Sequence, residues 1–199
     1  MKNSIPVLFL LLFVALGCGN SDSNSGVLSS LGFDDETDKA AELVGKANND
    51  LREIRKIQKA NAGKVEELGE AMKGRDTASV QKILDELISA IQDGLSYAET
   101  ARQKIEEAEE KKTNDKFNEY LRLKEQALQK QIDAFTFRLK VAKTLREKFG
   151  TNNQTEIESA KAEFQDQEEN FKKLWEAADD LSERANKIAR ENPNKIKAK

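Results

Sequence analysis

The fold is decided by residues 121–150, which read LRLKEQALQKQIDAFTFRLKVAKTLREKFG. Apolar residues recur there at every seventh position, and others fall three or four positions away. The recurring set is Leu121, Leu128, Phe135, Ala142 and Phe149, flanked by Ile132 and Leu139. This spacing places the whole set on one face of an α-helix, which a second helix must cover. We therefore expect a long amphipathic helix in this part of the chain.

The rest of the chain from residue 37 onward repeats this pattern. The expected helical segments are 37–73, 77–112, 116–149 and 155–191. They are separated by residues that typically end or begin helices, namely Gly74 with Asp76, Thr113 to Asp115, and Gly150 to Asn153. Gln58 and Asn61 are polar interruptions in the apolar register of the first segment. Near-equal helices joined by tight turns favour an all-α, antiparallel up-down-up-down four-helix bundle.

The turn at Thr113–Asp115 leaves an alternative open, because it contains neither glycine nor proline. If it stayed helical, the centre of the chain would be one rod of about 70 residues. The fold would then be an elongated antiparallel coiled coil with one long central helix. We favour the bundle, because the net charge of the four segments alternates in sign along the chain. The alanine-rich end of the second segment would also face the bulky residues Phe117, Tyr120 and Leu121, which suits close packing.

The composition excludes several classes of chemistry. The chain has 199 residues, of which 35% are charged, with no histidine and one cysteine. Mechanisms that need imidazole are therefore excluded, and an intramolecular disulfide cannot form. No glycine-rich phosphate-binding motif occurs, and carboxylate pairs such as Glu106-Glu107 fall mostly outside the apolar faces. We expect no catalytic residue, no metal site, no cofactor and no small-molecule substrate. With a net charge of −3, we also expect no nucleic-acid partner.

The amino-terminal residues 1–18 read MKNSIPVLFLLLFVALGC. The apolar run after Lys2 is shorter than the roughly 20 residues that cross a bilayer, and it is typical of a secretory signal. The sole cysteine, Cys18, follows the small residue Gly17 at the end of this run. The stretch resembles the lipobox of bacterial lipoproteins, although Ala15-Leu16 reverses the usual order of leucine and small residue. The resemblance implies cleavage after a signal peptide at 1–17 and acylation of Cys18, which would anchor the chain to a membrane.

The same resemblance bears on location. In the enterobacterial sorting rule, an aspartate after the cysteine retains a lipoprotein at the inner membrane, and Gly19 stands there instead. We therefore expect a lipid-anchored protein of the bacterial cell envelope, at the outer membrane, with its periplasmic or surface display left open.

Composition divides the rest of the chain. Serine, asparagine, glycine and aspartate dominate residues 19–36, which predicts a flexible tether. Together with the lipidated Cys18 that the resemblance implies, this tether makes up residues 18–36. The bundle is expected at 37–192, followed by a basic tail at 193–199. The predicted function is a non-enzymatic lipoprotein whose helical body is a binding or structural module. The alternative is a surface-exposed adhesin or host-ligand-binding lipoprotein.

A second apolar stripe on residues 116–149 includes Leu123, Phe137 and Val141. Phe137 lies about 200° around the helix from Phe135, at about 100° per residue, so both cannot face one narrow seam. One interpretation is that this helix is the most enclosed one of the bundle. The other is that Leu123, Phe137 and Val141 form an exposed row that binds a protein partner or a second copy.

Overall fold

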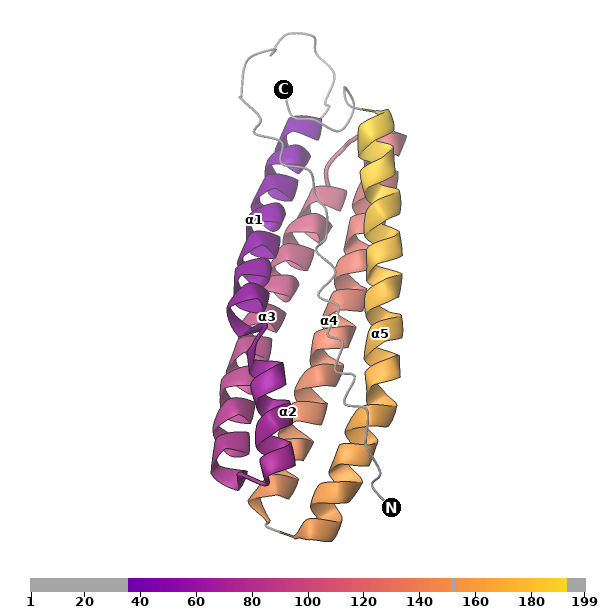
Figure 1. The fold of residues 1–199 in the computed structure, drawn as a ribbon. Coiled ribbons are helices and arrows are strands. Elements are labelled where there is room, and N and C mark those ends of the chain that lie inside the picture. The colour runs from indigo at the N-terminus through magenta and orange to yellow at the C-terminus, as the bar shows by residue number, and fades with distance from the viewer. Residues whose placement is uncertain (1–35, 152, 193–199) are drawn as a thin grey trace.

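The computed structural model describes residues 36–151 and 153–192, except for the side chains of residues 161 and 163–168. The helices are α1 (Thr37–Asn61), α2 (Lys64–Gly74), α3 (Thr77–Glu109), α4 (Asp115–Gly150) and α5 (Gln154–Glu191). They lie side by side in an all-α bundle, in which α1 and α2 together form one column and successive columns run in opposite directions (Figure 1). Cys18, the predicted signal peptide, the predicted tether before residue 36 and the predicted tail at 193–199 lie outside the described residues.

The turn at Thr113–Asp115 is a helix boundary. Asn114 caps α4, because its side-chain oxygen accepts the backbone N–H of Phe117 at 3.1 Å. Asp76 and Asn153 cap α3 and α5 with their side chains in the same way. Since α3 ends at Glu109 and α4 folds back along it, the predicted all-α bundle is confirmed, and the alternative with one long central helix is wrong.

The prediction of one uninterrupted helix over 37–73 is wrong, because the column is kinked at Ala62 and Gly63. The side-chain amide of Asn61 donates to the carbonyl oxygen of Ile57 at 2.8 Å, an interaction that competes with regular helical hydrogen bonding. Glycine in the next turn lowers the helix propensity further. Ala62 and Gly63 keep right-handed helical dihedral angles, so the chain bends there and continues in the same direction.

The core consists of three successive clusters along the bundle axis. The cluster at the α3–α4 end includes Ala101, Ala108, Phe117, Tyr120 and Leu121. The middle cluster is formed by Ile54, Ala98, Ala134, Phe135 and Trp175. The cluster at the α4–α5 end includes Leu68, Val80, Leu84, Leu145, Phe149 and Ile157. The predicted packing of alanines of α3 against the bulky start of α4 is confirmed at the α3–α4 end.

Ion pairs join side chains of neighbouring columns. Lys104 of α3 lies 2.6 Å from Asp50 of α1, and Arg102 of α3 lies 3.4 Å from Glu125 of α4. α3 packs on α1, α2 and α4, and α4 packs on α5, whereas α1 and α2 approach α5 much less closely. No helix in the described part of the chain is both long and apolar enough to span a membrane.

Candidate ligand-binding cavity

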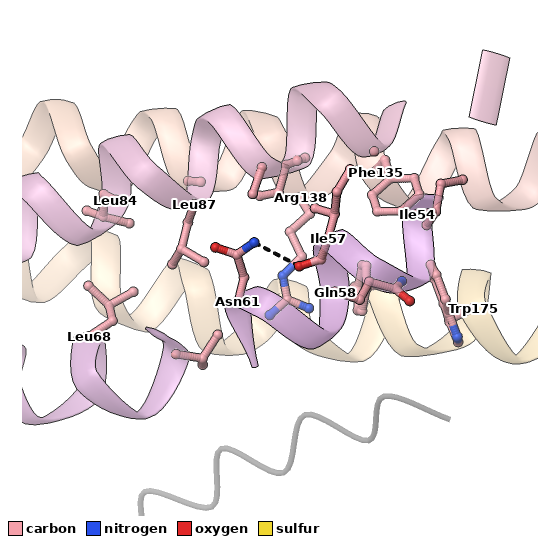
Figure 2. Close-up of a pocket in the computed structure, with 16 residues that line it drawn as sticks. Ile54, Ile57, Gln58, Asn61, Leu68, Leu84, Leu87, Phe135, Arg138 and Trp175 are labelled. Atoms are coloured by element: carbon pink, nitrogen blue, oxygen red, sulfur yellow. Dashed lines mark hydrogen bonds between the residues drawn. The ribbon is translucent and has the colours of Figure 1, made fainter. Parts of the chain in front are cut away.

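A cavity of about 110 Å³ lies inside the bundle at the level of the kink between α1 and α2. All five helices contribute to its walls, and most of the lining residues are apolar (Figure 2). The lining residues are Ile54, Ile57, Gln58, Asn61, Val65, Leu68, Leu84, Leu87, Ala90, Ile91, Gly94, Phe135, Arg138, Ala142, Phe171 and Trp175. The cavity joins the middle cluster to the cluster at the α4–α5 end.

The cavity exists because the side chains at this level do not fill the space between the columns. Three lining positions carry small residues, Ala90, Gly94 and Ala142. The kink interrupts the first column at the same level, between the lining residues Asn61 and Val65. The apolar side chains Leu87 and Ile91 are consequently only half-buried, although they lie on the inner side of α3.

Three polar side chains, Gln58, Asn61 and Arg138, line the cavity. Figure 2 shows them between an apolar group that includes Leu68 and one that includes Trp175. Gln58 and Asn61 are the residues that interrupt the apolar register of the first predicted helix. The structure therefore places both interruptions at the level of this cavity.

An aromatic wall closes one side of the cavity and holds Arg138. The Cζ atom of Arg138 lies 4.2 Å from the ring centroid of Phe171, which is cation–π geometry. Phe171 stacks on Trp175 with ring centroids 5.8 Å apart, and Phe135 meets Trp175 edge to face at the same separation. Trp175 is the sole tryptophan of the chain. Its indole N–H is buried and has no hydrogen-bond partner within the described part of the chain.

The groups with raised pKa values lie outside this lining. Burial raises the pKa of Asp179. Burial also raises the pKa of Glu109, and the neighbouring charges of Glu125 and Glu106 raise it further. The residues that the structure describes contain no group of three histidine, cysteine, aspartate or glutamate side chains that could hold a metal ion.

The predicted partner face on α4 is not an exposed row. Leu123 is 4% exposed and Val141 is 9% exposed, and both are covered by the bundle itself. Phe137 is half-buried. α4 packs on both α3 and α5. It therefore buries a wider face than a helix that packs against a single neighbour. The structure supports the interpretation of α4 as an enclosed helix, and the expectation of an exposed partner-binding row is wrong.

The cavity was not predicted from the sequence, although one signal pointed towards it. Two polar residues, Gln58 and Asn61, break an otherwise apolar register shortly before Gly63. Such a combination indicates a level at which a helix is neither regular nor fully packed. Comparison with known proteins does not assign this site, because no protein-family model, no curated protein and no solved structure matches this chain significantly.

Proposed function

We propose that this protein is a non-enzymatic lipoprotein, anchored by a lipid on Cys18 to the outer membrane of a bacterial cell envelope, with a helical body that acts as a binding module. The observation that carries the proposal is the position of the sole cysteine, directly after Gly17 at the end of a short apolar run. The cavity in the bundle favours binding over a purely structural role.

The entry of the chain into the bundle is compatible with such an anchor. The backbone N–H of Glu36 donates to the carbonyl oxygen of Lys112 at 2.9 Å, and the N–H of Lys112 donates to the Glu36 carboxylate at 3.4 Å. These bonds fix the start of α1 to the α3–α4 end of the bundle. From Cys18 to Glu36 the chain can span at most about 60 Å. An anchored body would therefore be attached to the membrane through its α3–α4 end.

The anchor is tested by replacing Cys18→Ser in the full chain expressed in a bacterium. We expect loss of labelled palmitate incorporation, together with release of the body into the soluble fraction or accumulation of the uncleaved precursor. Ser21→Ala, in the same segment, is the matched control and should remain acylated and membrane-bound. A Cys18→Ser protein that loses its signal peptide and still fractionates with the membrane would overturn the proposal.

A further inference from the structure

We propose that residues 27–33 of this chain, which read VLSSLGF, bind back onto the bundle along the border between α1 and α5, from the α3–α4 end to the level of Trp175. These seven residues lie outside the described part of the chain. The inference goes beyond the proposed function and does not depend on acylation of Cys18. It is carried by unpartnered polar atoms at this border, by half-buried apolar side chains along it, and by the length of chain that precedes Glu36.

Three buried polar atoms on α1 and α5 have no hydrogen-bond partner among the described residues. They are Nε of Arg55, Nε1 of Trp175 and Oδ1 of Asp179. Ile54, next to Arg55, belongs to the same core cluster as Trp175, and Asp179 follows Trp175 by about one helical turn. The three groups therefore lie near one level of the bundle. Buried polar atoms in proteins are almost always hydrogen-bonded, so this level is incomplete without a further partner.

An extended segment of chain suits this set of two donors and one acceptor. Each of its residues carries a backbone C=O, which can accept from Arg55 or Trp175, and a backbone N–H, which can donate to Asp179. The hydroxyl groups of Ser29 and Ser30 add further donors in the middle of residues 27–33. The polar atoms at the border are thus complemented by peptide.

Two lines of half-buried apolar side chains lead from this level to the α3–α4 end. Leu174, Leu181 and Ile188 are seven residues apart and form one line along α5, and Leu43 and Leu51 form the other along α1. All five pack against the core clusters but keep part of their surface exposed. Because α1 and α5 approach each other less closely than the other neighbouring columns do, an added apolar segment can cover both lines, and the area that it removes from water favours binding.

The length of chain before Glu36 matches the length of this border. Hydrogen bonds fix Glu36 to the α3–α4 end, and from there α1 extends about 28 Å to Arg55, at about 1.5 Å per residue. An extended chain from Glu36 back to Val27 spans about 30 Å. The start of residues 27–33 therefore reaches the unpartnered atoms, while Leu31 and Phe33 lie beside the two apolar lines.

Cleavage by chymotrypsin measures this docking, because the protease cuts after Phe33 where the segment is released from the bundle. The purified full chain is placed in phosphatidylcholine vesicles, so that no detergent competes for the apolar side chains, and the cleaved fragment is followed by mass spectrometry. Leu28→Asp opposes burial of the segment and should accelerate cleavage about tenfold or more. Ser23→Asp is the matched control, because it adds the same charge outside residues 27–33, and it should leave the rate unchanged.

The sole tryptophan supplies a second measurement, because a docked segment shields Trp175 from solutes. We expect Leu28→Asp to raise the acrylamide quenching constant of Trp175, and Ser23→Asp to leave it unchanged. Leu181→Gln, on the α5 line, should release the segment from the other side of the contact. The double variant with Leu28→Asp should be cleaved no faster than Leu28→Asp alone, since both substitutions remove the same docked state. A thermal melt of each variant establishes that the bundle is retained.

Three results would overturn the inference. The first is an equal rate of cleavage after Phe33 in the unaltered chain, Leu28→Asp and Ser23→Asp. The second is a quenching constant of Trp175 that Leu28→Asp leaves unchanged, which would assign the segment to the membrane surface. The third is protection that is lost when the protein is diluted in the vesicles, which would assign the segment to a second copy. Failure of the anchor is measured separately with Cys18→Ser, and a chain that is not acylated is compared in buffer in the same way.

Discussion

The α3–α4 end of the bundle and the level of the kink are built from the same kinds of residue, yet only the first is a filled core. At the α3–α4 end the small residues Ala101 and Ala108 pack with Phe117 and Leu121, and all four are fully buried. At the kink, small residues of α3 and α4 face an irregular stretch of the first column, and a cavity remains. The comparison teaches that small residues close a bundle only where bulky residues on a regular helix face them.

The largest expected difference between the two regions is in the cost of truncating a leucine. Leu121→Ala in the filled core should lower the free energy of unfolding by about 3–5 kcal/mol, because it creates a new cavity. Leu87→Ala at the existing cavity should cost about 2 kcal/mol or less, because the side chain is only half-buried. Denaturant-induced unfolding of both variants measures the difference. Equal losses would show that the kink level is as well packed as the α3–α4 end.

Adding volume should have opposite effects in the two regions. Ala101→Leu places three extra carbon atoms in a filled core and should destabilise the protein by about 1–3 kcal/mol. Ala90→Leu places the same atoms into the cavity and should stabilise it by about 0.5–1.5 kcal/mol. The melting temperatures should therefore move in opposite directions. Destabilisation by both substitutions would mean that the space at Ala90 is not available to a side chain.

The smallest difference concerns the backbone at the kink. Gly45→Ala, within the regular and exposed part of α1, should stabilise the protein by about 0.5–1 kcal/mol. The Cβ atom of Gly63→Ala would meet no atom closer than 3.9 Å, but the gain there should be smaller, because Gly63 lies in a turn where a helix former adds less. A gain at Gly63 as large as that at Gly45 would show that alanine is accommodated at the bend as well as within the regular helix.

The difference between the regions also explains what could be predicted from the sequence. Helices, their boundaries and the match of Ala101 and Ala108 to Phe117 follow from local patterns, because periodicity and capping residues act within a few residues of each other. The kink coincides with a side-chain hydrogen bond from Asn61 and with Gly63, in a sequence that otherwise continues as a helix. The cavity depends on which residues of five helices meet at one level, and the burial of Leu123 depends on α4 having a neighbour on two sides. Neither the cavity nor the burial of Leu123 can be read from the sequence of a single helix.

The bonds between Glu36 and Lys112 have a mechanical consequence. The described chain enters and leaves the bundle at the same end, since α1 begins and α5 finishes there (Figure 1). A pull on a membrane anchor would first load these bonds and then slide α1 along α3, against the ion pair between Lys104 and Asp50. The turns after α2 and α4 lie at the opposite end of the bundle, away from the bonds that such a pull would load (Figure 1). If the proposed anchor exists, the bundle would be held by its α3–α4 end, and the cavity would lie beyond the part that bears the load.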